Sequence, residues 1–128
     1  MSVGPPVRHL SPTTLPRPMA HILFVDDDPT VGAILHDTLF RMGHTPYGAS
    51  NIPEALGVLQ RESLDLIILD HRMPGMTGLE FLEYLREEGS DVPVIMLTGH
   101  GSIEHAVAAI KAGAVDYITK PVRADQLE

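Results

Sequence analysis

Several apolar segments of this chain end in a polar side chain that could take part in chemistry. These side chains are carboxylates, one hydroxyl and one ammonium group, and they belong to Asp26, Asp27, Asp28, Asp70, Thr98 and Lys120. If the apolar segments are parallel strands, their carboxyl ends meet at one edge of a sheet, which is where open α/β folds bind ligands. We therefore expect these groups to converge on a single site.

Carboxylates that crowd together repel one another unless a cation lies among them. Oxygen ligands with room for water suit Mg²⁺, or Mn²⁺ in its place. We expect Asp26, Asp27 and Asp70 to hold this ion. Asp70 could then act as a nucleophile and accept a phosphoryl group, since phosphoryl transfer needs little beyond positioning and charge neutralisation. Thr98 would donate from its hydroxyl group, and Lys120 would supply a fixed positive charge.

Each of these residues also has an ordinary structural interpretation. An aspartate after a strand is usually a turn former or a helix cap, and a lone lysine or threonine is usually a surface or loop residue. Asp28 keeps that interpretation, because it precedes Pro29 and is well placed to cap the next helix. The seven histidines lack metal-ligand spacing, so we predict that they lie at the surface or in support of the site. The functional interpretation depends on the joint arrangement.

The apolar pattern predicts the elements that would bring these side chains together. Short segments that are apolar on both faces predict parallel strands at residues 21–25, 44–49, 64–69, 92–97 and 114–118. Helical spacing predicts helices at residues 29–42, from about residue 51, around 79–85 and at 102–112. Asn51 with Glu54, and Thr77 with Glu80, have the spacing of capping boxes. The alternation predicts an α/β fold, a doubly wound five-stranded parallel sheet with helices on both faces.

The composition limits the class of protein. The 128 residues have room for one domain, cysteine is absent, and the formal net charge is −8. The acidic balance argues against direct contact of this segment with nucleic acid. No apolar run is long enough to span a membrane, and the lack of cysteine suits a cytoplasmic protein.

The two ends of the chain differ from its middle. Residues 1–18 contain repeated prolines and little hydrophobic periodicity, which predicts a disordered Pro-rich tail before a domain at residues 19–128. The residues after Pro121 begin like an amphipathic helix that is too short to be stable alone. We therefore expect a truncated C-terminal helix and a longer parent protein whose output domain is absent from this chain.

Four motifs, in order and at fitting intervals, make residues 20–128 similar to the receiver domains of response regulators, the signalling proteins of two-component systems. They are FVDDDP at residues 24–29, the segment from Asp70 that includes Met73-Pro74-Gly75 and Gly78, MLTGHG at 96–101, and AGAVDYITKP at 112–121. The resemblance implies a flavodoxin-like receiver fold and a phosphorylated switch. It implies no enzyme beyond slow self-catalysed phosphotransfer and dephosphorylation.

The resemblance also implies how the phosphoryl group arrives. Asp26 and Asp27 would bind Mg²⁺, and the main-chain carbonyl of Arg72 would be a further ligand. A sensor histidine kinase would phosphorylate Asp70. Arg72 and His100 would flank the phosphoryl group, where bulky basic side chains could exclude water and prolong the phosphorylated state.

The same resemblance implies a two-state response. Thr98 and Lys120 would bind the phosphoryl oxygens, and Tyr117 would swing inward into the space that Thr98 leaves. The surface of the fourth helix, fifth strand and fifth helix would then change its partner, which could be the output domain, a downstream protein or a second copy of the chain. The bond between Lys120 and Pro121 would be cis.

Three other interpretations compete with this one. A haloacid-dehalogenase-type phosphatase would use the pattern D-x-D-x-T on Asp26, Asp28 and Thr30, with Asp26 as the nucleophile. It would lack its late acidic pair and leave Asp70 without a role. A receiver-like module that is never phosphorylated would not need all the chemical residues found here. A flavodoxin-type flavin binder would need a Ser/Thr/Gly-rich first loop, whereas this loop is acidic.

Overall fold

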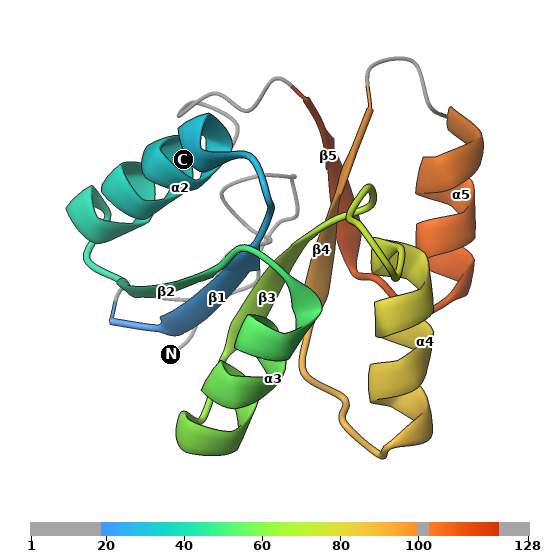
Figure 1. Ribbon diagram of the computed structural model, residues 1–128, viewed down its shortest axis with the longest axis horizontal. Coiled ribbons are helices and arrows are strands. Elements are labelled where there is room, and N and C mark those ends of the chain that lie inside the picture. Colours follow the sequence, from blue (N-terminus) through green and yellow to red (C-terminus); the bar gives the residue numbers. More distant parts are fainter. Residues whose placement is uncertain (1–18, 100–102, 121–128) are drawn as a thin grey trace, which may run out of the picture.

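The computed structural model describes residues 19–99 and 103–120, and its centre is a five-stranded parallel sheet (Figure 1). The strands, in the order β2-β1-β3-β4-β5, are bounded in sequence as β1 (His21–Val25), β2 (Thr45–Ala49), β3 (Leu66–Asp70), β4 (Val94–Thr98) and β5 (Asp116–Thr119). β1 is the switch point in the strand order: β2 pairs with it on one side, and β3 and the later strands follow on the other. Open α/β sheets bind ligands at such a switch point. The predicted sheet is confirmed.

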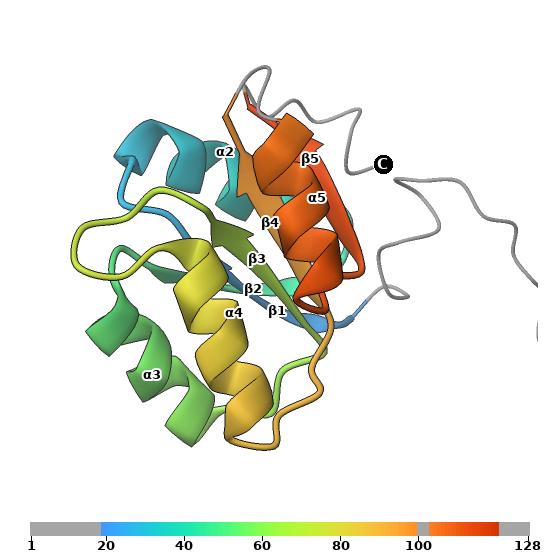
Figure 2. The same cartoon turned by 90° about the vertical axis from the view of Figure 1, so that its right-hand side faces the viewer.

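Helices cover both faces of this sheet (Figure 2). They are α2 (Pro29–Arg41), α3 (Ile52–Arg61), α4 (Gly78–Glu87) and α5 (Ile103–Lys111). Leu35 and Leu39 of α2 pack on one face of the sheet. Residues of α3, α4 and α5 pack on the other face. The predicted doubly wound arrangement is therefore confirmed.

The middle strands supply side chains to two separate cores. In β3, Leu66 and Ile68 join the core beneath α2, whereas Ile67 and Leu69 join the core beneath the other helices. All four side chains are buried. Burial on both faces explains why the strand is apolar throughout, and it gives the residue at its end a rigid support.

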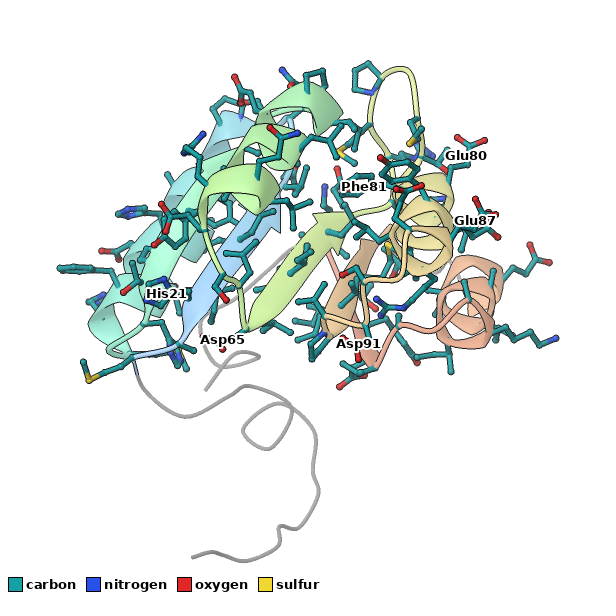
Figure 3. All side chains as sticks on the ribbon, turned by 90° about the horizontal axis from the view of Figure 1, so that it is seen from below. His21, Asp65, Glu80, Phe81, Glu87 and Asp91 are labelled. Atoms are coloured by element: carbon teal, nitrogen blue, oxygen red, sulfur yellow. The ribbon has the colours of Figure 1, made fainter. Side chains whose placement is uncertain are left out.

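Local hydrogen bonds start two helices at predicted positions. Asp28 caps α2, since its Oδ1 accepts the N–H of Thr30 at 2.9 Å. At α4 the Oγ1 of Thr77 accepts the N–H of Glu80 at 3.1 Å, and the Oε1 of Glu80 accepts the N–H of Thr77 at 2.9 Å. Figure 3 shows Glu80 pointing away from the domain and Phe81, the next residue of α4, pointing toward the sheet. The predicted capping box at α4 is confirmed.

The cap of α3 follows the prediction only in part. The Oδ1 of Asn51 accepts the N–H of Glu54 at 2.9 Å, as expected. The carboxylate of Glu54, however, accepts the N–H of Ser50 at 2.7 Å. Asn51 is fully extended (φ −159°, ψ 173°), and the preceding N–H lies within reach of Glu54.

Three strands begin about two residues later than predicted. The segments expected at 64–69, 92–97 and 114–118 are β3, β4 and β5, which start at Leu66, Val94 and Asp116. Leu64 and Val92 are apolar because they pack against the core from the connecting loops. The same strands also end one residue later than predicted, so Asp70 and Thr98 are the last residues of their strands rather than the first residues of loops.

Some predictions concern parts of the chain outside the described residues. These are the tail at 1–18, His100, and the segment that starts with Pro121, including its peptide bond to Lys120. The division into tail and domain stays a prediction. Within residues 19–99 and 103–120, no helix has the length and apolar character that crossing a membrane requires.

Candidate functional site

The predicted residues share one edge of the sheet because their strands are neighbours. β3 pairs with β1 on one side and with β4 on the other, and β4 pairs with β5. Asp70 ends β3 and Thr98 ends β4. Asp26 and Lys120 directly follow β1 and β5. Four separate strands therefore place their terminal residues at the carboxyl edge.

Lys120 lies between two buried carboxylates. Its Nζ is 3.1 Å from the Oδ2 of Asp26 and 3.1 Å from the Oδ1 of Asp70. Asp26 is 5% exposed and Asp70 is 3% exposed. The main chain of Lys120 is anchored as well, because its N–H donates to the carbonyl of Thr98 at 2.9 Å. One ammonium group thus serves two carboxylates that are shielded from water.

Three carboxylates in this site could share a cation. Asp26, Asp27 and Asp70 each offer an oxygen, and these oxygens lie within 4.8 Å of one another. The Oδ1 of Asp26 accepts the N–H of Asp28 at 2.9 Å. Its Oδ2 is buried and, within the described ranges, accepts no well-aligned hydrogen bond, although the Nζ of Lys120 lies 3.1 Å away. A buried oxygen without a well-aligned hydrogen bond beside two further carboxylates fits a hard divalent cation.

The electrostatics of the site also favour a cation. Burial, followed by the negative charge of Asp26, raises the pKa of Asp70 to about 6. The ammonium group of Lys120 and the N–H of Arg72 act in the opposite direction without outweighing burial. Burial lowers the pKa of Lys120, but its contacts with Asp26 and Asp70 raise this pKa above its ordinary value. The protein therefore holds Asp70 as a carboxylate at a cost that a nearby cation would reduce.

The loop from β3 to α4 borders the carboxylates. The N–H of Arg72 donates to the Oδ1 of Asp70 at 3.3 Å, and the Arg72 side chain is exposed. An open cleft lies between this loop and Asp27, and its lining consists of Asp27, His71, Arg72, Met73, Pro74 and Thr77. The cleft exposes one side of the acidic group to solvent. The metal contact expected of the Arg72 carbonyl stays a prediction.

The two residues expected to move occupy contrasting environments. Thr98 is 1% exposed at the end of β4, whereas Tyr117 on β5 is 44% exposed. Tyr117 is therefore in an outward position, and the inward position predicted for the switched state is not the one described here. The movement of both residues stays a prediction.

Two features of the structure were missed or misjudged from the sequence. His44 is neither at the surface nor near the site: it is buried, its Nδ1 accepts the N–H of Ala20 at 3.3 Å, and burial lowers its pKa. Gly78, noted only as part of a motif, is in close contact with the main chain of Asp70. Both depend on how the folded backbone packs, and hydrophobic periodicity carries no signal for them.

Comparison with known proteins agrees with this geometry. A family model described as the response regulator receiver domain matches residues 22–128. The response regulator protein PilR of Pseudomonas aeruginosa is 42% identical over 100 residues, which is 78% of this chain and 22% of that protein. The nitrogen assimilation regulatory protein NtrX of Azorhizobium caulinodans is 43% identical over 112 residues, 85% of this chain and 25% of that protein. The chain thus spans about a quarter of the length of these relatives.

Solved structures support the same assignment. The receiver domain of NtrX from Brucella abortus superimposes with a TM-score of 0.78 at 36% identity, covering 83% of this chain and 90% of that one. Full-length FixJ from B. japonicum gives a TM-score of 0.79 at 34% identity, covering 86% of this chain and 54% of that one. With the parallel sheet and the strand-end residues described above, these matches show that the chain belongs to the response regulator receiver domain family of two-component signalling.

Proposed function

We propose that this receiver domain is switched by phosphorylation of Asp70, and that a sensor histidine kinase is the phosphoryl donor. The observation that carries the proposal is the buried pair Asp26 and Asp70 with the Nζ of Lys120 at 3.1 Å from each. A buried carboxylate with a raised pKa, next to a second carboxylate and a lysine, is an unusual and costly arrangement. It is accounted for if Asp70 reacts with an anion that Lys120 helps to neutralise.

Mg²⁺, or Mn²⁺ in its place, is the ion that we assign to the acidic group. Asp26, Asp27 and Asp70 would hold it with side-chain oxygens, and Arg72 with its main-chain carbonyl. The bound ion would neutralise charge on the transferring phosphoryl group. Asp27 is exposed, which leaves room for the waters that Mg²⁺ usually keeps.

The reaction then needs only positioning by the chain's own residues. A carboxylate oxygen of Asp70 attacks the phosphorus of a phosphohistidine, and the new O–P bond forms as the N–P bond breaks. The electron pair leaves with the imidazole nitrogen, which takes up a proton from water. Lys120 stays next to Asp70 throughout and contacts the phosphoryl oxygens. Thr98 donates a hydrogen bond from its hydroxyl group to one of these oxygens.

The acyl phosphate adds negative charge where two carboxylates already crowd, and we infer that this drives the switch. Thr98 and Lys120 turn toward the phosphoryl oxygens, and Tyr117 moves from its exposed position into the space beside Thr98. The phosphoryl group shifts this equilibrium only by the difference in its contacts with the two states. The domain acts as a switch and does not turn over a substrate.

The surface that responds includes α5, β5 and the connection between them. Several large apolar side chains are exposed there, namely Val107, Ile110, Val115 and Tyr117. We infer that an output domain of the parent protein, a downstream protein or a second copy of the chain covers them in one state. The relatives are longer proteins with regulatory names, among them the transcriptional regulatory protein GlrR of Escherichia coli. We place the protein in the cytoplasm and assign no nucleic-acid contact to this segment.

Arg72 and His100 would set the lifetime of the switched state. Arg72 lies two residues after Asp70 and its exposed side chain borders the cleft. A basic side chain over the phosphoryl group would exclude the water that hydrolyses it. We expect the double variant Arg72→Ala, His100→Ala to lose phosphate faster than the parent chain, and an unchanged half-life would exclude this role.

Intact-protein mass spectrometry with a small phosphodonor tests the main proposal. The chain incubated with acetyl phosphate and Mg²⁺ should gain the mass of one phosphoryl group, and EDTA should prevent the gain. Asp70→Asn should abolish it. Asp91→Asn is the matched control, because Asp91 is an exposed aspartate in the loop before β4, and it should leave the gain unchanged. Normal uptake by the Asp70→Asn variant would exclude Asp70 as the acceptor.

A further inference from the structure

Gly78, the first residue of α4, lies unusually close to the main chain at the end of β3. A Cβ atom on Gly78 would be 2.2 Å from the carbonyl oxygen of Asp70 and 2.9 Å from the Cα of His71. Real Cβ atoms essentially never approach another heavy atom within 3.0 Å. Both contacted atoms belong to the backbone, so rotation of a side chain could not relieve the clash. Only glycine allows α4 to begin at this place.

The same residue closes the loop that borders the site. The N–H of Gly78 donates to the carbonyl of His71 at 2.8 Å, and the N–H of His71 donates to the carbonyl of Leu97 in β4 at 2.9 Å. The loop between His71 and Gly78 is thereby closed at its base and tied to the sheet. This loop includes Arg72, whose N–H holds the Oδ1 of Asp70 at 3.3 Å. A shift at Gly78 would therefore affect Asp70 in two ways: by direct contact with the Asp70 carbonyl, and through the N–H of Arg72 that donates to the Asp70 side chain.

Other glycines in the described ranges have different surroundings. A Cβ on Gly57 in α3 would meet only the Nη1 of Arg61 at 3.5 Å, which is an ordinary contact with a flexible side chain. A Cβ on Gly75 would meet nothing within 4 Å, although its φ of +87° favours glycine for conformational reasons. The constraint at Gly78 comes instead from contact with the residue that we propose as the phosphoryl acceptor.

We propose that Gly78 is a positioning residue of the phosphorylation site: its missing side chain lets the first turn of α4 hold the backbone of Asp70 and Arg72 where the metal ion and the phosphoryl group bind. This inference rests on the proposed function. A methyl group at position 78 must displace α4 or the Asp70 carbonyl by roughly 1 Å, and a displacement of that size costs about a hundredfold in reactions that depend on positioning.

The test compares Gly78→Ala with Leu85→Ala in the complete chain. Leu85 is buried in the same helix and packs in the core beneath α3, α4 and α5, so its truncation destabilises α4 without touching the backbone of Asp70. Both variants are measured for urea unfolding, for Mg²⁺ and Mn²⁺ affinity by calorimetry, and for the rate of phosphoryl uptake from acetyl phosphate.

We expect Gly78→Ala to lose at least tenfold in Mg²⁺ affinity and about a hundredfold in phosphorylation rate. Leu85→Ala should keep both within a few-fold of the parent chain, even where it is equally destabilised. Equal behaviour of the two variants would overturn the inference. If the parent chain takes up phosphate but Gly78→Ala does so equally well, only this inference fails; if the parent chain takes up none at Asp70, the proposed function fails.

A measurement on the unaltered chain covers the case in which Gly78→Ala does not fold. If the hydrogen bond from the Gly78 N–H to the His71 carbonyl, at the base of the loop, is coupled to the metal site, Mg²⁺ should slow hydrogen exchange of the Gly78 amide. The amide of Ser90, which donates to the carbonyl of Leu85 at the other end of α4, serves as the internal control and should not respond. Exchange at Gly78 that ignores Mg²⁺ would overturn the inference.

Discussion

At the scale of single residues, the site is defined by a shortage of positive charge. Asp26, Asp27 and Asp70 bring three carboxylates together, and Lys120 supplies one ammonium group. Two of these carboxylates are buried, so water cannot compensate the remaining negative charge. One divalent cation would balance it. The raised pKa of Asp70 follows from the same shortage.

This raised pKa makes the stability of the metal-free domain depend on pH. The pKa of Asp70 is about 6 when folded, against an ordinary value of 3.8, so the folded chain binds this proton more tightly than the unfolded chain does. The stabilisation is fully present below the ordinary value and is lost as the pH rises toward 6. Over this window the free energy of unfolding should fall by up to about 3 kcal/mol on account of Asp70.

The variant Asp70→Asn cannot ionise at this position and should escape that loss. In EDTA, urea unfolding should show Asp70→Asn to be more stable than the parent chain at about pH 7.5, with the difference much smaller at about pH 4. Asp26 remains as a partner for Lys120 in this variant. A difference that does not vary with pH would show that burial of the Asp70 carboxylate is not costly.

Residue types and their order were enough to predict which side chains meet, but not how closely. The convergence of Asp26, Asp70 and Lys120 could be predicted because each lies at the carboxyl end of an apolar strand, and parallel strands end at the same edge. The close contact of Gly78 with Asp70 and the burial of His44 could not be predicted, because each depends on how the folded backbone packs and not on residue type or periodicity.

At the scale of elements, the start of α4 is the structure that joins local sequence to the site. The capping box of Thr77 and Glu80 satisfies two N–H groups that the helix would leave unpaired. The next residue, Gly78, is the one in contact with the carbonyl of Asp70. The cap therefore fixes the helix end that contacts the main chain of Asp70.

We expect Thr77→Ala to cost about 1 kcal/mol in the free energy of unfolding, because the N–H of Glu80 loses its acceptor. Thr77→Ser keeps the hydroxyl group and should cost only a few tenths of that amount. Urea unfolding of the two variants with Mg²⁺ present measures the difference. If serine and alanine are equally destabilising, the hydroxyl group is not what stabilises the start of α4.

Elements were predicted well in kind and less well in extent. β3 and β4 start later than predicted because Leu64 and Val92 pack against the core from loops. A sequence shows that a residue is apolar, but it does not show whether that residue lies in a strand or in the loop before it. The caps at Asp28 and Thr77 were predictable because they depend on neighbours within a few residues. The hydrogen bonds of helix caps can be predicted from sequence, whereas the residues at which a strand starts and ends depend on its pairing with the neighbouring strand.

At the scale of the whole molecule, metal binding should raise the free energy of unfolding of the domain. An ion that binds the folded chain and not the unfolded one stabilises it by about 2.7 kcal/mol at a hundred times its dissociation constant. Asp27 offers a way to isolate this effect, because it is the exposed member of the acidic group. Its replacement should disturb little of the folded structure.

We expect Asp27→Asn to match the parent chain within about 0.5 kcal/mol in EDTA and to lose most of the stabilisation that Mg²⁺ gives the parent chain. Thermal unfolding at increasing Mg²⁺ concentrations measures both. The control is Asp91→Asn, which removes an exposed aspartate away from the site and should respond to Mg²⁺ as the parent chain does. Equal Mg²⁺ responses in both variants would exclude Asp27 as a ligand.

The fold and family of the whole domain could be predicted because the strand–helix alternation and the strand-end residues agree with one another. The partners of the domain could not, since the chain spans about a quarter of the length of relatives such as PilR and NtrX. The exposed apolar side chains of α5 and β5 mark a surface without identifying what covers it.

The most direct test of the account is to locate the phosphoryl group in the unaltered chain. After reaction with acetyl phosphate and Mg²⁺, borohydride reduces an acyl phosphate to an alcohol, and peptide mass spectrometry identifies the reduced residue. We expect that residue to be Asp70, with Asp26 and Asp27 unchanged. Reduction at Asp26, or at no aspartate in a chain that has gained phosphate, would contradict the account.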